Sequence, residues 1–294
     1  GNHFYCINTA YIIVPKNECA IDIRYMLAVL NSKLMEFYHK RVSKLKREGY
    51  YEYFAKQLRR LPIREIDLRK GKDKTIHDRI VDFVTKLIDA RQRLLLLEKT
   101  FDECTALYPS NESLSRLKTY YEYDGIQPKV LGDFNRKRGT VYAFKVYKEK
   151  AKITLLIDYV PEESENQETI ISGTPALDLK FKDERLCDFI YYSLRKFIAE
   201  TGKKILGRGN ILKVIQTGIC IPTFVTNQKE NVKVIRKIMN QFQARTEGLL
   251  GKHVTLEQLE CEIQALDNEI EIEVRNLYGI TKNEGNIIQT ELLS

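Results

Sequence analysis

The chain has 294 residues, of which 43% are hydrophobic and 30% charged, a composition typical of a folded globular protein. No apolar run approaches the roughly 20 residues that span a bilayer and no signal peptide opens the sequence, so we expect no membrane partner. The six cysteines are scattered without a C-x-x-C pair, which argues against a disulfide framework or a zinc site and favours a cytoplasmic protein with reduced thiols. Because the chain begins at Gly1 without an initiator Met, we expect a piece of a longer protein.

The net charge of +8 is unevenly distributed along the chain. Lys33–Lys72 holds 13 basic and five acidic residues, and Lys129–Lys152 holds eight basic and two acidic residues. Leu256–Ser294 is the opposite, with nine acidic and two basic residues. A polyanion would therefore meet the first two regions and avoid the last.

The N-terminal part is expected to run strand, helix, basic loop. Residues 2–15 are predicted to form a strand, and Ile21–Val42 a helix with Lys33, Glu36, His39 and Lys40 on its polar side. The apolar stripe of this helix is predicted to consist of Ile23, Met26, Leu27, Leu30, Leu34, Phe37 and Tyr38.

The segment Arg41–Arg60 mixes cations with aromatic rings, a combination that can neutralise phosphates and stack on bases. A solvated charged loop is the alternative interpretation. Tyr53–Ile63 is predicted to be extended and to end at Pro62, and Arg64–Lys74 to be a polar linker. For four apolar side chains at the end of this segment, core packing is favoured over DNA contact: Tyr53, Phe54, Leu61 and Ile63.

Three long helices are predicted around a central region. Thr75–Tyr108 has apolar residues in heptad order, as in a coiled coil, and Asn231–Leu250 and Leu256–Ile280 are also helical, the last with Glu273 interrupting its seam. The tail from Asn283 is expected to be frayed.

The central region is predicted to be mixed. Val141–Tyr147 and Ile153–Val160 alternate like a β-hairpin, and Asp183 is a plausible N-cap for a helix that ends at Thr201. The motif Gly207-Arg208-Gly209 is predicted to be a flexible basic loop, and Ile211–Pro222 to be extended.

Together these elements predict an α+β fold, in which mixed recognition regions are joined by long heptad-patterned helices that form a bundle or spacer. The expected parts are a recognition region at 1–72, a spacer helix at 73–109, a second α+β recognition region at 110–228, and a C-terminal helical segment at 229–294 that packs on the spacer.

A catalytic constellation is hard to find, since the chain lacks H-E-x-x-H, G-x-x-x-x-G-K-[ST], G-x-S-x-G and G-x-G-x-x-G. Its four histidines are isolated in sequence. Asp158, Asp178 and Lys180 match the loose carboxylate–lysine pattern of Mg²⁺-dependent nucleases, although surface carboxylates give the same pattern by chance.

Two stretches near the start, YMLAVLNSKLMEFYHKRVS at Tyr25–Ser43 and YYEYFAKQLRRLPI at Tyr50–Ile63, resemble the TaqI-like C-terminal specificity domain. That domain belongs to N6-adenine DNA methyltransferases and to fused type II restriction–modification enzymes. The stretch ALDNEIEIEVRNLYGIT at Ala265–Thr281 resembles the terminal helix of these enzymes.

The resemblance implies a target recognition region that grips duplex DNA and presents an adenine to a methyltransferase domain, which flips the base out of the stack. The family's N-P-P-Y and its glycine motif for S-adenosylmethionine are missing here, so we expect no methylation activity and no cofactor in this chain. S-adenosylmethionine is expected to bind the catalytic domain of the parent protein.

The candidate DNA-binding residues fall into three groups, one after the first helix and two in the central region; no catalytic or metal-binding residue is assigned. They are Lys40, Arg41, Lys44, Lys46, Arg47, Tyr50, Tyr51, Lys56, Arg59 and Arg60, then Arg136, Lys137 and Arg138, then Lys203, Lys204 and Arg208.

Two alternatives remain open at this stage. One is an Mg²⁺-dependent nuclease domain, which requires Asp158, Asp178 and Lys180 to converge within reach of one metal ion. The other is a helical assembly protein that docks a partner along its heptad seams and has no salt-dependent affinity for duplex DNA.

Overall fold

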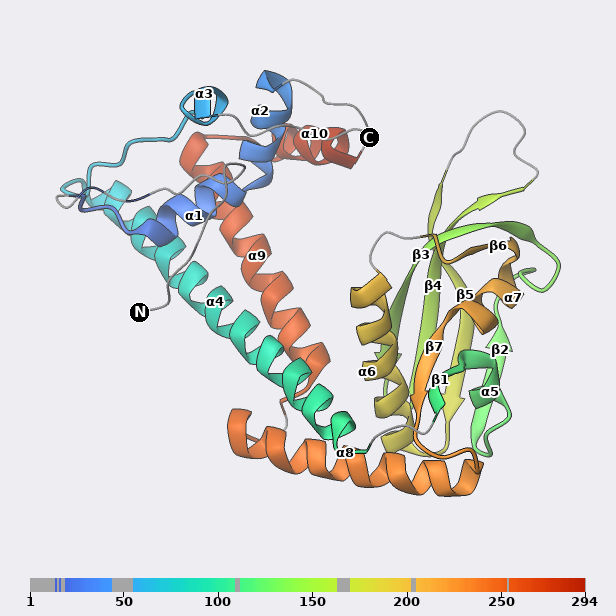
Figure 1. Ribbon diagram of the computed structural model, residues 1–294. Coiled ribbons are helices and arrows are strands. Elements are labelled where there is room, and N and C mark those ends of the chain that lie inside the picture. The colour runs from blue at the N-terminus through green and yellow to red at the C-terminus, as the bar shows by residue number, and fades with distance from the viewer. Residues whose placement is uncertain are drawn as a thin grey trace. The chain divides into compact units, whose positions relative to one another are not determined.

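The structure is a computed structural model that describes residues 14, 16, 19–43, 55–108, 112–162, 170–201, 205–252 and 254–293. Its helices are α1 (Ile23–Asn31), α2 (Lys33–Val42), α3 (Ala55–Leu58), α4 (Gly71–Ala106), α5 (Leu117–Tyr121), α6 (Glu184–Thr201), α7 (Ile211–Gly218), α8 (Gln228–Leu250), α9 (Leu256–Tyr278) and α10 (Lys282–Leu293) (Figure 1). Within these ranges, no helix combines the length and the apolar character that crossing a membrane would require.

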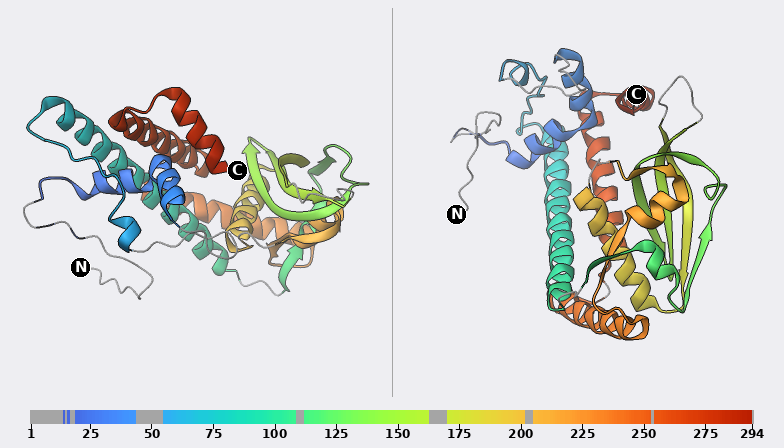
Figure 2. Two further views of the ribbon diagram at one scale, coloured as in Figure 1. Left: turned by 90° about the horizontal axis from the view of Figure 1, so that it is seen from above. Right: turned by 45° about the vertical axis from the view of Figure 1, so that its right-hand side comes forward.

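The strands form two antiparallel sheets. A curled sheet of five strands has the order β2-β5-β4-β3-β6, and a second sheet pairs β1 with β7 (Figures 1 and 2). The strands are β1 (Glu112–Arg116), β2 (Ile126–Val130), β3 (Arg138–Glu149), β4 (Lys152–Pro161), β5 (Ile171–Phe181), β6 (Gly207–Asn210) and β7 (Cys220–Thr223). The predicted α+β class is therefore confirmed.

The chain divides into two compact units. Unit 1 consists of Gly1–Leu94 and Gln258–Ser294, and unit 2 is the intervening Leu95–Glu257. The four-part division expected from the sequence stays a prediction.

Unit 1 is organised around one hydrophobic core, to which residues from both ends of the sequence contribute. Tyr25 and Val29 of α1 are fully buried, as are Ile80 of α4 and Leu277 of α9. Burying apolar surface is the main favourable term in folding, so α1 and α2 depend on α9 for their stability.

The single helix predicted at Ile21–Val42 is wrong, because the chain breaks it at Ser32 into α1 and α2. Ser32 is extended, with φ −69° and ψ 150°, and is at once the C-cap of α1 and the N-cap of α2. The break changes which side faces the core. Ile23 and Leu27 of the predicted stripe are 46% and 45% exposed, whereas His39, placed on the polar side, is 3% exposed.

Three further predictions in unit 1 need correction. Residues 55–58 of the segment expected to be extended form α3, and α4 starts at Gly71, inside the predicted linker. The tail expected to be frayed is α10, which contacts α2. Its first turn has a capping box, in which the Glu284 backbone N–H donates to Thr281 Oγ1 at 3.3 Å and the Thr281 backbone N–H donates to Glu284 Oε2 at 2.8 Å.

Unit 2 confirms the predicted hairpin. β3 and β4 pair antiparallel up to Glu149 and Lys152, with Lys150 at φ 53° in the turn. Asp183 is the predicted N-cap of α6, since its Oδ1 accepts from the Arg185 backbone N–H at 3.0 Å.

The region after α6 differs from its prediction. Residues 207–209, expected to be a flexible loop, belong to strand β6 on the edge of the five-stranded sheet. Residues 211–218, expected to be extended, form α7, with Asn210 as its N-cap and with Ile211 and Ile215 buried. The branched residues that favoured a strand instead form the buried side of a short helix.

Candidate nucleic-acid interface

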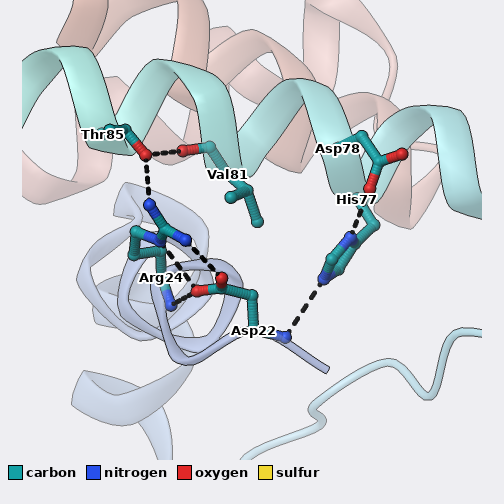
Figure 3. Close-up of polar contacts among 6 residues, drawn as sticks. All are labelled: Asp22, Arg24, His77, Asp78, Val81 and Thr85. Carbon is teal, nitrogen blue, oxygen red and sulfur yellow. Dashed lines mark hydrogen bonds and ion pairs between the residues drawn. The ribbon is translucent and has the colours of Figure 1, made fainter. Parts of the chain in front are cut away.

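A polar cluster joins the start of α1 to α4 (Figure 3). Asp22 Oδ1 accepts from the Arg24 backbone N–H at 2.8 Å, and Asp22 Oδ2 lies 2.6 Å from Arg24 Nη2; these hydrogen bonds lower the pKa of Asp22 to about 2. Arg24 Nη1 donates to Thr85 Oγ1 at 2.8 Å, and the Asp22 backbone N–H donates to His77 Nε2 at 3.2 Å. With Nε2 accepting, His77 Nδ1 carries the proton and donates to Asp78 Oδ1 at 2.9 Å. The entry of α1 is thus fixed on α4.

The break at Ser32 sets the direction of α2. Ser32 Oγ donates to the Val29 carbonyl at 2.8 Å and accepts from the Met35 backbone N–H at 3.2 Å. The Lys33 backbone N–H donates to Glu271 Oε1 of α9 at 2.8 Å. Burial raises the pKa of Glu271 above its ordinary value. This carboxyl oxygen gives a partner to a backbone N–H that has none within the helix, so α9 holds the start of α2.

The last turn of α2 carries the first candidate cations, Lys40 and Arg41. Lys40 Nζ is 3.0 Å from Glu36 Oε1 on the same helix. Arg41 forms an ion pair with Glu291 of α10, and its guanidinium carbon lies 4.3 Å from the centroid of the Phe37 ring. Both cations therefore have partners within unit 1, and Arg41 ties α2 to α10.

A second group of candidate cations, Lys56, Arg59 and Arg60, lies on α3 and the turn that follows it. All three are exposed, and none has an ion pair with another residue of the described ranges. Because their charges are not neutralised by neighbouring carboxylates there, they are well suited to bind phosphate groups.

The exit from this turn is anchored to the core of unit 1. Leu61 and Ile63 pack against the buried cluster, which confirms their predicted core role. Tyr278 Oη of α9 donates to the Pro62 carbonyl at 2.8 Å, and the Arg64 backbone N–H donates to Tyr278 Oη at 3.1 Å. A fixed exit holds the cationic turn close to a packed scaffold.

In unit 2 the structure brings together two candidates that are 70 positions apart, Arg138 and Arg208. Pairing of β3 with β6 sets Arg208 opposite Thr140, two residues after Arg138. Arg138 Nε is 2.6 Å from Glu162 Oε2, and Arg208 Nη2 is 4.0 Å from Glu162 Oε1. The hydrogen bond from Arg138 lowers the pKa of Glu162 below its usual value. The two arginines thus form one positively charged corner of the sheet.

Arg136 and Lys137 lie immediately before this corner and are exposed. Lys137 Nζ is 5.4 Å from the centroid of the buried Phe134 ring. The Asn210 side chain donates to the Asn135 carbonyl at 2.8 Å, which ties this turn to the start of α7. Four predicted residues therefore converge here from two separate segments.

Several candidates fall outside the described residues. Tyr53 and Phe54 do so as well, as does the strand expected at 2–15 apart from position 14. The candidates concerned are Lys44, Lys46, Arg47, Tyr50, Tyr51, Lys203 and Lys204.

The nuclease hypothesis is wrong in its geometry. Asp178 pairs with Thr154, which lies four residues from Asp158 along β4, a separation of about 13 Å. The two carboxylates also have separate partners: Asp178 Oδ1 accepts from Thr154 Oγ1 at 2.7 Å, and Asp158 Oδ1 accepts from the Gly173 backbone N–H at 2.7 Å. Ligands of one Mg²⁺ ion lie about 2 Å from it, so these groups cannot share an ion. Nowhere in the described ranges do three or more His, Cys, Asp or Glu side chains gather as a metal site.

A half-buried ion triad in unit 2 was missed by the sequence analysis. Lys148 Nζ lies 3.0 Å from Asp188 Oδ1 and 3.3 Å from Glu257 Oε1, beside a cavity of about 560 Å³. Burial raises the pKa of Asp188 despite the nearby ammonium, and burial raises the pKa of the adjacent Cys187 thiol to about 12. With the thiol protonated and the carboxylates paired, this site fastens β3 to α6 and supplies no nucleophile. The alternation of apolar and polar residues along β3 could not indicate this triad, because Lys148 is a charged residue at a core-facing position.

Comparison with known proteins gives one match. Residues 2–63 match the model of the TaqI-like C-terminal specificity domain, which confirms the resemblance found in the sequence. No curated protein and no solved structure matches the chain. The matched segment contains α1, α2 and α3, with the cap at Ser32 and the exposed cations Lys56, Arg59 and Arg60. This match supports a DNA-specificity role for the chain in a methyltransferase-type protein.

Proposed function

We propose that this chain is the target recognition region of a restriction–modification adenine-N6 DNA methyltransferase. In this role it binds duplex DNA and positions an adenine for a catalytic domain of the parent protein, to which S-adenosylmethionine binds. The match of residues 2–63 to the TaqI-like specificity domain is the observation that carries this proposal.

The charge pattern supports the proposal. The exposed cations of α3 lie in the basic region Lys33–Lys72, and Arg138 of the corner lies in the basic region Lys129–Lys152. Phosphate contacts fix the register of a protein on a duplex, and arginines that reach a groove edge can read guanine. We assign phosphate contacts first to Lys56, Arg136 and Lys137, which have no ion pair with a described residue, and base reading to Arg59, Arg60 and Arg208.

The test is duplex binding, measured by fluorescence anisotropy across a salt series. The logarithm of affinity should fall linearly with the logarithm of salt concentration, with a slope of about −0.9 for each phosphate contact. Arg59→Ala combined with Arg60→Ala should weaken binding at least tenfold, because each arginine contributes on the order of 1–3 kcal/mol to a base or phosphate contact.

Lys72→Ala combined with Lys74→Ala is the matched control, since both residues are exposed at the start of α4 and their removal changes the net charge equally. Binding without salt dependence, or an equal loss of affinity in the two double variants, would contradict the proposal. The assembly-protein alternative predicts the first of these outcomes.

A further inference from the structure

One face of the five-stranded sheet is left open by the packing of unit 2. Alternate residues of β4, among them Ile153, Leu155 and Ile157, are fully buried on the face that α6 contacts (Figure 1). The residues between them point to the opposite face. There Lys145 and Tyr147 of β3 are exposed, and Tyr147 is 57% exposed.

The strand register defines the composition of this open face. Tyr147 pairs with Thr154, Thr154 with Asp178, and Asp178 with Lys129, which makes one row across four strands. On the same face, Lys152 and Lys180 form the next row in one direction along the strands, and Lys145 lies one row away in the opposite direction. Arg208 of β6 lies opposite Thr140, farther along in that second direction. The charged residues of the face are thus six cations, Lys129, Arg138, Lys145, Lys152, Lys180 and Arg208, and three carboxylates, Glu149, Asp158 and Asp178.

The carboxylates of this face are engaged, whereas three of its cations are not. Asp158 and Asp178 accept the hydrogen bonds described above, and Glu149 Oε2 lies 3.9 Å from Lys152 Nζ. Lys129, Lys145 and Lys180 are exposed and have no ion pair within the described residues. The face therefore presents three lysines and a phenol hydroxyl, groups that donate hydrogen bonds to phosphate.

The spacing of these lysines fits a duplex. Lys129 and Lys145 are three strands apart in the order β2-β5-β4-β3, a separation of about 15 Å. The major groove of DNA is about 12 Å wide, so ammonium groups at this separation can contact the phosphates on its two sides. The same face continues through Thr140 to Arg208 and the charged corner at Arg138.

We propose that the open face of the five-stranded sheet, with Lys129, Lys145, Lys180 and Tyr147, is a second phosphate-binding surface that clamps the DNA backbone. This inference rests on the proposed function of the chain as a duplex-binding region and assigns contacts to residues outside the segment matched by the family model. Charge complementarity to a polyanion selects the partner.

The test is the salt dependence of duplex binding by a triple variant, Lys129→Gln, Lys145→Gln and Lys180→Gln. The matched control is Lys118→Gln, Lys229→Gln and Lys237→Gln, which removes three exposed lysines from α5 and α8. The face variant should reduce the steepness of the salt slope by about 2 to 3, and the control by less than about 1. Tyr147→Phe should weaken binding about fivefold without changing the slope, because it removes a neutral donor.

Lysine acetylation of the unmodified protein gives a second readout that needs no variant. Bound duplex should protect Lys129, Lys145 and Lys180 from acetylation and leave Lys118, Lys229 and Lys237 reactive. Equal slopes for the two triple variants, together with unprotected face lysines, would overturn this inference and leave the proposed function standing. Absence of salt-dependent binding by the unmodified protein would overturn both.

Discussion

Ser32 determines where α1 ends and where α2 begins, so its replacement by alanine should loosen this part of unit 1. The side chain is 1% exposed, and its Oγ both accepts from the Met35 N–H and donates to the Val29 carbonyl. Loss of an N-cap costs about 1 kcal/mol on average and about 2 kcal/mol in unfavourable cases. We expect the higher value, because the buried Met35 N–H would have no replacement partner, whereas the Val29 carbonyl keeps the Ser32 backbone N–H at 3.3 Å.

Hydrogen–deuterium exchange measured by mass spectrometry tests this expectation, with α6 of unit 2 as an internal reference. A loss of about 2 kcal/mol increases the open population about 30-fold, so amides in the first turn of α2 should exchange roughly 10 to 30 times faster. Ser43→Ala is the control at the other end of α2: it removes the hydrogen bond between Ser43 Oγ and His39 Nε2 at 2.9 Å but keeps the Ser43 backbone N–H, which donates to the His39 carbonyl at 2.9 Å, so exchange in the first turn of α2 should not change. Unchanged exchange in α2 for Ser32→Ala, or equal acceleration in α6, would refute this account of the helix break.

Three further predictions concern buried charges and are tested by urea unfolding followed by circular dichroism. Glu273 is 6% exposed and pairs with Arg79 at 3.1 Å. Glu273→Leu should leave the free energy of unfolding unchanged or increase it, whereas Arg79→Ala should lower it by about 2 kcal/mol because the buried carboxylate loses its partner. Equal losses of stability in the two variants would contradict this argument. Lys148→Met should destabilise by about 3 kcal/mol by leaving Asp188 and Glu257 unpaired, and adding Asp188→Asn should recover part of that loss. Because folding raises the pKa of Glu271, the contribution of this group to stability falls as the pH rises from its unfolded pKa through its folded pKa. Relative to the unmodified protein, Glu271→Gln should therefore be more stabilising at pH 7 than at pH 4. The opposite trend would count against the assignment.

The sequence predicted the hairpin and the cap at Asp183 well, because both depend on local signals: alternation, turn length and an acidic residue before an apolar run. It failed at Ser32, because the helical spacing of apolar residues continues through a residue that ends one helix and begins the next. It also failed at 211–218, where β-branched residues pack as a helix against the sheet. The convergence of Arg138 and Arg208 could not be predicted, since it depends on a pairing between strands that are distant in sequence.

The discontinuity of unit 1 has a consequence for how the protein is made. The core around Tyr25 includes Ile270 and Leu277, so α1 and α2 cannot complete their packing until these two residues have left the ribosome. Unit 2 is continuous and can fold while synthesis proceeds. Folding of unit 2 shortens the effective loop between the two segments of unit 1, Gly1–Leu94 and Gln258–Ser294. A shorter loop reduces the entropy cost of bringing these segments together. The segment that matches the specificity domain is therefore expected to finish folding after unit 2, although it is translated before unit 2.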